Sequence, residues 1–322
     1  MVSEMAKQLA SKFKYLPETI ERFIALFGLD ETEKMLLAYE KHPKATIRTN
    51  TLKIDSYALK ERLEWKGFIL EETILDSDGF VVKKQPFSLG STTEYLSGFY
   101  FIQSQASWLP TILLDPKSNE IIIDMAAAPG GKACHIAQKM KNKGSLVCID
   151  ISRERIRSLR SNLSRCGVIN NICIRMDGRD LNKLQLKADK LLLDAPCSGE
   201  GLMAVDKKRR LERGLEDINR MSQLQKELLA AGISSLKKNG VLVYSTCSTA
   251  PEENEENIDW AINNYPIKIE ETNLLDFSPG LVTAFDKKYN EDLQKAIRLY
   301  PHKNGTEGFF VCKLRLLEEI NI

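Results

Sequence analysis

The chain has 322 residues, of which 43% are hydrophobic and 28% are charged, and its formal net charge is only +2. This balance is typical of a folded globular protein and excludes a disordered tail or a collagen-like fibre. The seven cysteines are scattered and form no CxxC pair, so we expect no bound metal, no disulfide scaffold and a reducing cytoplasm. No run approaches the roughly 20 apolar residues that span a bilayer, and the first residues lack a signal-peptide core. We therefore expect a soluble cytoplasmic protein with no membrane partner.

Residues 1–100 predict a small helical and α+β module. One amphipathic helix is expected over residues 17–28, and a second begins at Asp30, with Glu33 at the spacing of a capping box. Strand and helix then alternate through "ATIRTNTLK", "SYALKERLEWKG" and "FILEETIL", and the helical stretch "IQSQASWLPTILLD" leads into the next domain.

Residues 101–322 predict a doubly wound α/β domain. Short, continuously apolar strands recur in "EIIID", "SLVCID", "NICIRMD", "DKLLLDAP" and "GVLVYSTC", with helical segments between them. Strands without alternation imply a parallel sheet covered on both faces. The ligand of such a sheet lies outside the carboxyl ends of its strands. A strand near "IKIEET" and a closing pair near "GFFVCKLRL" are expected to extend the same sheet.

A glycine turn joins the first of these strands to a helix in "DMAAAPGGKACHIA". Gly130 and Gly131 would let a ligand approach the backbone at the start of that helix. Asp150 ends the next strand, where a ribose diol needs an acceptor, and Asp177 follows the third strand, where an adenine amino group could be bound. The glycines do not have the G-x-G-x-x-G spacing. S-adenosylmethionine fits this pattern, and a nicotinamide cofactor stays open.

Two cysteines follow the last two core strands, in "DAPCSGEG" (Cys197) and "YSTCST" (Cys247). Small polar residues surround both, so neither has the apolar neighbours of a core thiol, and both are expected in one crevice with Asp194 and Lys132. The other cysteines are interpreted as small buried hydrophobic residues: Cys134, Cys148, Cys166, Cys173 and Cys312.

A thiol beside a methyl donor suggests covalent catalysis on a pyrimidine. A thiolate that adds to carbon 6 makes carbon 5 nucleophilic enough to accept a methyl group. Such a site also needs an acid at ring nitrogen 3 and a base for the carbon 5 proton. The positive charge of Lys132 would favour the thiolate.

The segments "DMAAAPGGK", "DAPCSGEG", "YSTCS" with "PEENE", and "HKNGTEGFFVCKL" resemble the Nop/Sun (Fmu) family of RNA cytosine-5 methyltransferases over residues 48–314. The resemblance implies a Rossmann-like class I methyltransferase domain with a mostly parallel seven-stranded sheet, and an RNA-binding function for the N-terminal module of residues 1–100. We expect a monomer. It implies that Cys247 is the covalent nucleophile, that Cys197 assists product release, and that Asp194 binds the base. Lys132 would be the lysine of the cofactor turn. The implied S-adenosylmethionine site consists of Ala126, Ala127, Ala128, Pro129, Gly130, Gly131, Lys132, Asp150, Arg155, Asp177 and Asp194.

The chain departs from the family pattern in two places. Ala133 and Cys134 stand where a threonine often follows the lysine, and "HKNGTEGFF" has two residues more than the usual histidine–glycine–threonine run. Because of these two additional residues, a contact between His302 and substrate stays open.

The stretch "VDKKRRLER" (residues 205–213) follows Cys197 closely and has five basic residues, so RNA phosphates are its expected partner. The candidates are Lys207, Lys208, Arg209 and Arg210, and the resemblance adds Arg48 and Lys53 of the N-terminal module. Gln103 and Ser104 could approach substrate, whereas Phe99, Tyr100 and Phe101 are expected in the core. The target cytosine should be unpaired or flipped out, with tRNA as the first choice and rRNA as the second.

Two other functions fit part of the pattern. A dehydrogenase of the same fold predicts a phosphate-binding glycine pattern, which is absent. A non-catalytic RNA-binding module predicts loss of the acid or the thiols, and all of them are present.

Overall fold

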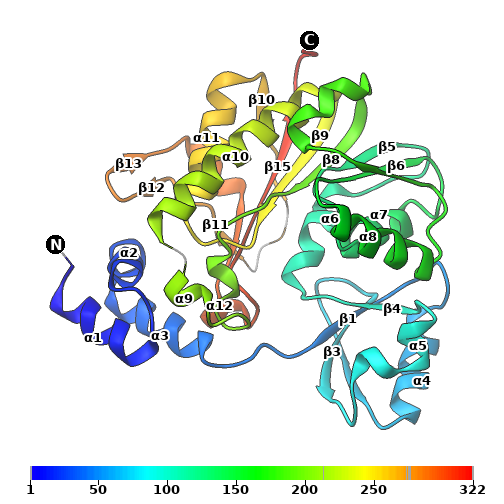
Figure 1. The fold of residues 1–322 in the computed structure, drawn as a ribbon, viewed down its shortest axis with the longest axis horizontal. Coiled ribbons are helices and arrows are strands. Elements are labelled where there is room, and N and C mark those ends of the chain that lie inside the picture. Colours follow the sequence, from blue (N-terminus) through cyan, green and yellow to red (C-terminus); the bar gives the residue numbers. More distant parts are fainter. Residues whose placement is uncertain (1, 213, 273, 275–276, 321–322) are drawn as a thin grey trace. The chain divides into compact units, whose positions relative to one another are not determined.

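The structure is a computed structural model that describes residues 2–212, 214–272, 274 and 277–320 (Figure 1). It divides into two compact units, each assembled from three segments of the chain. The thiol-pair unit, which carries Cys197 and Cys247, consists of Met1–Pro43, Ala195–Leu229 and Ser245–Cys312. The glycine-turn unit consists of Lys44–Asp194, Ala230–Tyr244 and Lys313–Ile322. In the part of the chain that is described, no helix is both long enough and apolar enough to cross a membrane. The domain boundary expected at residue 100 stays a prediction.

The N-terminal part of the glycine-turn unit is a four-stranded antiparallel sheet. The strand order is β2 (Ile69–Glu72), β3 (Gly79–Lys84), β1 (Thr46–Thr49) and β4 (Tyr100–Ile102). Helices α4 (Ser56–Trp65) and α5 (Thr93–Leu96) lie beside this sheet (Figure 1). The side chains of Tyr100 and Phe101 are buried, as the sequence predicts.

The larger sheet of the protein contains the predicted parallel strands. They are β5 (Ile121–Asp124), β6 (Ser145–Asp150), β7 (Asn171–Arg175), β8 (Ala188–Asp194) and β9 (Leu236–Thr246). Strand β5 pairs in parallel with β6 and β8, and β6 pairs in parallel with β7. Over the described residues the sheet has nine strands, in the order β11-β14-β15-β9-β8-β5-β6-β7 with β10 on β15. The mixed, parallel-rich fold is confirmed, and the sheet is two strands larger than the predicted seven.

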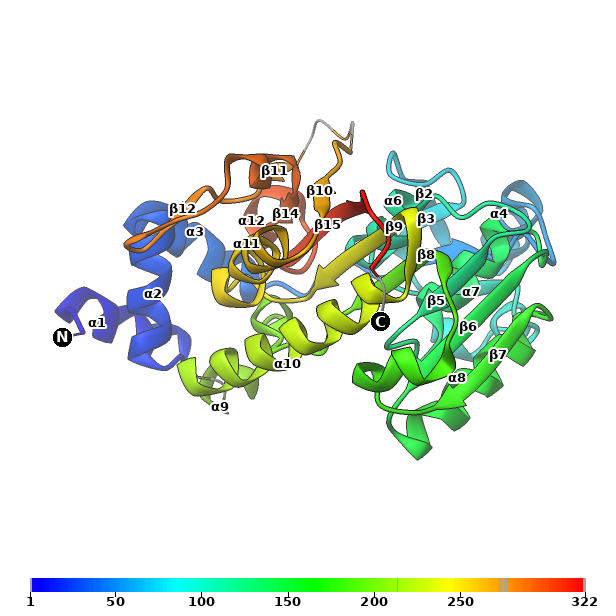
Figure 2. The same ribbon diagram turned by 90° about the horizontal axis from the view of Figure 1, so that it is seen from above.

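Three helices lie side by side along one face of these parallel strands (Figures 1 and 2). They are α6 (Leu109–Leu114), α7 (Gly131–Lys139) and α8 (Arg153–Arg165). The central strands β5 and β6 are almost entirely buried, as predicted, but the five residues of β7 are all half-buried or exposed, and Ile172 is 57% exposed. Burial on both faces was wrong for β7 because this strand is the edge of the sheet.

The thiol-pair unit is mainly helical. Its helices are α1 (Glu4–Phe13), α2 (Pro17–Phe27), α3 (Leu29–Tyr39), α9 (Arg209–Glu212), most of α10 (Leu215–Ser234), α11 (Glu255–Asn264) and α12 (Pro301–Asn304). Its strands are β10 (Ile267–Ile269), β11 (Ser278–Pro279), β12 (Thr283–Ala284), β13 (Lys287–Lys288), β14 (Ile297–Leu299) and the first half of β15 (Phe309–Leu316).

Helices α1 to α3 share an apolar cluster that includes Phe23, Met35 and Tyr39. The expected capping box of Asp30 and Glu33 is wrong, since Gly28 is the N-cap of α3 and no side chain caps it.

Candidate active site

The glycine turn connects β5 to α7 at the carboxyl edge of the parallel strands. Gly130 has φ 109° and is the N-cap of α7, a backbone conformation that side chains other than glycine rarely adopt. Two side chains of α8 donate to the carbonyls of the turn: Arg155 Nη2 to Ala128 O at 2.6 Å and Asn162 Nδ2 to Pro129 O at 2.9 Å. These two hydrogen bonds from α8 therefore hold the backbone of the turn in place.

Three predicted carboxylates stand at this edge of the sheet. Asp150 is the last residue of β6, Asp194 is the last residue of β8, and Asp177 lies two residues beyond β7. Parallel pairing brings the carboxyl ends of these strands to the same edge. The prediction that acids gather at the strand ends thus agrees with the geometry within the glycine-turn unit.

A cavity of about 210 Å³ opens at this edge. Its lining includes residues 126–129 and Gly131 of the turn together with Lys132 and Asp194, and also Gln103, which sequence reasoning placed near substrate. Lys132 Nζ lies 2.7 Å from Asp194 Oδ2, so the lysine pairs with the predicted base-binding acid. A favourable effect of Lys132 on a thiolate stays a prediction.

Asp150 and Asp177 are not part of the described cavity lining. Asp150 accepts from the backbone N–H of Ser152, and its other oxygen lies 3.4 Å from Arg155 Nη1. Asp177 forms an ion pair with Arg179 at 2.7 Å, and this hydrogen-bonded contact lowers the pKa of Asp177. Binding of adenine by Asp177 would require this ion pair to rearrange, and both roles stay predictions.

Sequence reasoning missed Asp124, the last residue of β5. Asp124 lines the cavity, is 1% exposed, and neither carboxylate oxygen has a hydrogen-bond partner among the described residues. Burial raises the pKa of Asp124 to about 7, against a smaller opposing effect of Lys132. The signal was present in "EIIID", which ends in an acid exactly as "SLVCID" does.

The thiol pair lies in the thiol-pair unit. Cys197 Sγ and Cys247 Sγ are 3.1 Å apart, and both residues are half-buried. The prediction that these two thiols share one site is thus met for the cysteines themselves; that Asp194 and Lys132 share it stays a prediction. Of the five cysteines assigned to the core, Cys173 is only half-buried and the other four are buried.

Glycines let the loops around the thiol pair approach closely. Gly201 N donates to Cys247 O at 2.9 Å, and Gly308 N donates to Gly201 O at 3.1 Å. A Cβ atom on Gly201 would lie 1.9 Å from Gly308 O, so no larger residue fits without moving the backbone. The "GEG" and "GTEG" segments therefore pack backbone against backbone beside Cys247.

Two predicted RNA contacts are corrected by their burial. Arg48 is 1% exposed and donates to Gln138 and to Gly131 O, inside the glycine-turn unit. Arg210 is 3% exposed and donates to Met203 O, to Phe13 O, to Tyr39 O and to Glu40. Both guanidinium groups are occupied by internal acceptors, so neither is available to a phosphate in this structure.

The remaining basic candidates reach the surface to different degrees. Lys208 is exposed, and Lys207 is exposed with a salt bridge to Glu40 at 3.3 Å. Arg209 is half-buried and donates to Ser198 O at 2.8 Å. Lys53 donates to two backbone carbonyls, of Ser97 and Arg165. Arg213, the last residue of the predicted basic stretch, lies outside the described residues.

The side chain of His302 contacts Glu31 within the thiol-pair unit. Its Nε2 lies 3.0 Å from Glu31 Oε2 of α3, its side chain is 8% exposed, and burial lowers its pKa. The "HKNG" part of the longer run lies in and just after the short helix α12, whose C-cap is Gly305 with φ 65°. His302 is thus engaged within the thiol-pair unit.

Comparison with known families decides what kind of protein this is. The family model of the 16S rRNA methyltransferase RsmB/F matches residues 111–315, and that of the N-terminal domain of 16S rRNA methyltransferase RsmF matches residues 16–105. The chain belongs to the RsmB/F methyltransferase family. The predicted resemblance to RNA cytosine-5 methyltransferases is confirmed at the level of the family.

Individual relatives of this RsmB/F-family chain differ in size and in the RNA substrate that their names state. A 28S rRNA (cytosine-C(5))-methyltransferase of Mus musculus is 38% identical over 98% of this chain, which spans only 40% of that protein. A tRNA (cytosine(49)-C(5))-methyltransferase of Pyrococcus abyssi is 36% identical over 89% of this chain and 93% of its own length. The crystal structure of NSun6 from Pyrococcus horikoshii with SFG has a TM-score of 0.84 and 30% identity, covering 93% of this chain and 97% of that one.

Proposed function

We propose that this chain is an RNA (cytosine-5) methyltransferase that uses S-adenosylmethionine as methyl donor. The observation that carries the proposal is the pair of thiols 3.1 Å apart, on the two loops in which the family resemblance implies a nucleophile and a release group. In this family assignment Cys247 adds to carbon 6 of the cytosine, and Asp194 binds the ring at nitrogen 3. The base that later removes the carbon 5 proton allows Cys247 to leave, and Cys197 assists that step.

The glycine-turn unit contains polar atoms of the chemical type that S-adenosylmethionine needs as hydrogen-bond partners. Asp124 has two carboxylate oxygens without hydrogen-bond partners among the described residues, and Gln103 Oε1 likewise has none. The start of α7 presents backbone N–H groups at the glycine turn. When bound, this cofactor supplies the methyl group; Asp150 would accept from its ribose and Asp177 from its adenine. The related NSun6 structure with SFG, an analogue of S-adenosylmethionine, supports the same proposal.

The RNA class is proposed by analogy with relatives whose names state a substrate. The Pyrococcus abyssi relative, 36% identical, and a tRNA (cytosine(72)-C(5))-methyltransferase of Pyrococcus horikoshii, 42% identical over 72% of this chain, are both named as tRNA methyltransferases. We therefore infer tRNA as the substrate. Ribosomal RNA is the second candidate because the mouse relative, 38% identical over 98% of this chain, is named as an rRNA methyltransferase.

The covalent mechanism predicts a specific trapped species. Cys197→Ala, incubated with unmodified tRNA transcript and S-adenosylmethionine, should accumulate a protein–RNA adduct that survives a denaturing gel, since the thiol that assists release is gone. The Cys197→Ala/Cys247→Ala double variant is the matched control and should form none. An adduct that persists in the double variant would refute Cys247 as the nucleophile, and no adduct in Cys197→Ala would refute the release role.

A further inference from the structure

The acidic stretch "PEENEEN" (residues 251–257) turns its polar side chains inward. Glu253, Asn254, Glu255 and Asn257 are all 0% exposed, although a run of acids and amides is usually solvated. It begins four residues after Cys247 and forms a turn of 3-10 helix and the start of α11. Buried polar side chains persist where each has hydrogen-bond partners, so the partners indicate what the stretch holds.

Glu253 contacts both loops that carry the thiols. Its Oε2 accepts from the backbone N–H of Ser198 at 2.9 Å and from Gln225 Nε2 at 2.9 Å. Its Oε1 accepts from the hydroxyl groups of Ser198 and of Ser248, the latter at 2.6 Å. Ser198 directly follows Cys197, and Ser248 directly follows Cys247. One carboxylate therefore joins the residues that are neighbours of both thiols in the chain.

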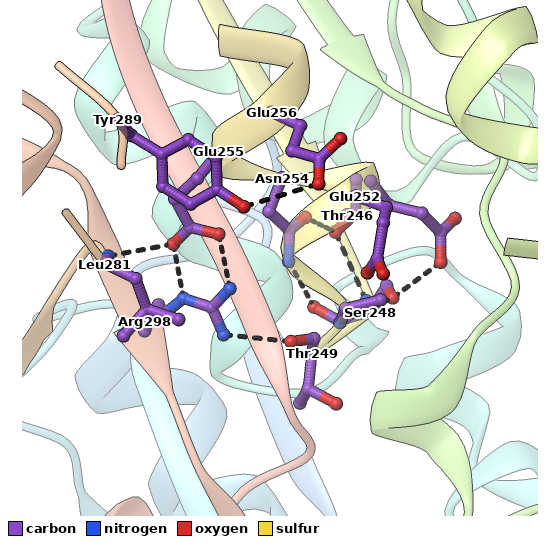
Figure 3. Close-up of polar contacts among 12 residues, drawn as sticks. Thr246, Ser248, Thr249, Glu252, Asn254, Glu255, Glu256, Leu281, Tyr289 and Arg298 are labelled. Carbon is purple, nitrogen blue, oxygen red and sulfur yellow. Dashed lines mark hydrogen bonds and ion pairs between the residues drawn. The ribbon is translucent and has the colours of Figure 1, made fainter. Parts of the chain in front are cut away.

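Two other members of the stretch, Asn254 and Glu255, hold the Cys247 loop alone (Figure 3). Asn254 pairs with Thr246 Oγ1 at 2.6 Å and donates to Ser248 O at 2.9 Å, on the Cys247 loop. Glu255 accepts twice from Arg298, which in turn donates to Thr249 O at 3.0 Å. These contacts fix the Cys247 loop to the unit, whereas those of Glu253 fix the two loops to each other.

We infer that Glu253 is a positioning residue that holds the Cys197 and Cys247 thiols at the separation that catalysis requires. The inference rests on the proposed function, in which both thiols act on one cytosine ring. Both oxygens of Glu253 already accept two hydrogen bonds each, so the carboxylate serves to orient the loops. Displacement of a catalytic group by about 1 Å can cost about a hundredfold in rate.

Substitutions at Glu253 separate positioning from acid–base chemistry. Glu253→Ala removes all four acceptor contacts. Glu253→Gln can keep them, because the amide oxygen accepts from the Ser198 N–H and from Gln225 while the amide nitrogen donates to the two serine hydroxyl groups, which also accept. A positioning residue is therefore restored by glutamine, whereas a proton-transferring carboxylate is not.

The matched control is Glu256→Ala, three residues further along. Glu256 pairs with Lys287 at 2.7 Å. Figure 3 shows its other contact, with the Tyr289 hydroxyl group at 3.3 Å. Ser248→Ala provides a second variant, in case Glu253→Ala does not fold. It keeps the carboxylate and removes one of its four contacts, together with the contacts of the Ser248 hydroxyl group with Ser198 Oγ and the Ala250 N–H.

The first measurement needs neither RNA nor cofactor. Diamide accepts two electrons and two protons from a pair of nearby thiols and is reduced to a hydrazine, and peptide mass spectrometry then quantifies the Cys197–Cys247 disulfide. The rate should fall at least about tenfold in Glu253→Ala, since disulfide geometry is specific. It should fall less in Ser248→Ala, and Glu253→Gln and Glu256→Ala should react like the wild type.

The second measurement is methyl transfer to tRNA. Glu253→Ala should lower kcat about a hundredfold with the KM for S-adenosylmethionine unchanged, and Glu253→Gln should restore kcat to within about threefold. Wild-type cross-linking in both Glu253→Ala and Ser248→Ala would overturn the inference, as would a loss of kcat in Glu253→Gln equal to that in Glu253→Ala. A wild-type protein that methylates no RNA would refute the proposed function, while the cross-linking rates would still test Glu253.

Discussion

At the scale of single residues, the environment of each acid at the strand ends differs. Asp194 is paired with Lys132, Asp177 with Arg179, and Asp150 lies near Arg155, whereas Asp124 is buried without a hydrogen-bond partner among the described residues. Burial raises the pKa of Asp124 to about 7, whereas the hydrogen-bonded contact with Arg179 lowers the pKa of Asp177.

Asp124 predicts a pH dependence of stability. Its pKa is raised by burial to about 7, so the folded protein binds a proton that the unfolded chain has lost above about pH 4. This group therefore stabilises the fold least above pH 7, and the free energy of unfolding should decrease as the pH rises from 4 to 7. Asp124→Asn removes this component, which amounts to up to about 4 kcal/mol at 1.36 kcal/mol per pKa unit.

Urea unfolding of the wild type and of Asp124→Asn at pH 5 and pH 8 measures the contribution of Asp124 to the pH dependence of the unfolding free energy. Glu200, whose pKa burial also raises to about 7, contributes equally to both proteins, so the difference between them isolates Asp124. The same change in unfolding free energy between the two pH values in both proteins would contradict the assignment.

The burial of Arg48 and its internal hydrogen bonds predict that this residue stabilises the fold and does not contact RNA. Arg48→Met keeps the apolar stem but leaves Gln138 and Gly131 O without their donor, so it should destabilise the protein by about 2–4 kcal/mol in chemical unfolding. Arg62→Met is the control, because Arg62 is half exposed and its salt bridge to Glu94 contributes less than about 1 kcal/mol. Equal unfolding free energies for the two variants would contradict the structural role of the buried Arg48 side chain.

At the scale of elements, the apolar runs of the sequence were sufficient to locate the parallel strands. Strands β5, β6 and β8 lie where continuous hydrophobic residues predict them, because burial on both faces leaves few polar positions. The two-residue strands β11, β12 and β13 were not predicted, since segments this short carry no periodic signal. The cap of α3 was assigned wrongly because Gly28 precedes the acidic residues and takes the cap position itself.

The basic stretch before and within α9 predicts an electrostatic contribution to RNA binding. The plot of log affinity for tRNA against log salt has a negative slope. The double variant Lys207→Ala/Lys208→Ala should make this slope less steep by about 1 to 2, because each phosphate contact releases nearly one counterion. Filter binding between low and moderate salt measures the slope. Lys238→Ala, an exposed lysine of β9, is the control, and an unchanged slope in the double variant would remove this stretch from the RNA interface.

At the scale of the whole molecule, the positions of the two thiols and of three of the four acids at the strand ends, Asp150, Asp177 and Asp194, could be predicted from sequence because they follow or end predicted strands. What could not be predicted was which charged residues are buried. Arg48 and Arg210 carry the same charge as Lys208, and only the surrounding backbone carbonyls distinguish an internal guanidinium from a phosphate contact. Burial of the "PEENEEN" stretch was equally unpredictable, since its partners lie tens of residues away.

Ligand-dependent stability separates the methyltransferase from a dehydrogenase. S-adenosylmethionine at a hundred times its Kd should raise the free energy of unfolding by about 2.7 kcal/mol, whereas NADH should leave it unchanged. Thermal unfolding with each ligand measures the two effects. Stabilisation by NADH alone would favour the nicotinamide interpretation that the glycine spacing left open.

The identity of the product tests the central proposal most directly. Unmodified tRNA is incubated with S-adenosylmethionine carrying a deuterated methyl group, digested to nucleosides and analysed by mass spectrometry. The wild type should yield deuterated 5-methylcytidine and Cys247→Ala none. Label on any other nucleoside or atom, or undiminished 5-methylcytidine from Cys247→Ala, would contradict cytosine methylation through that thiol.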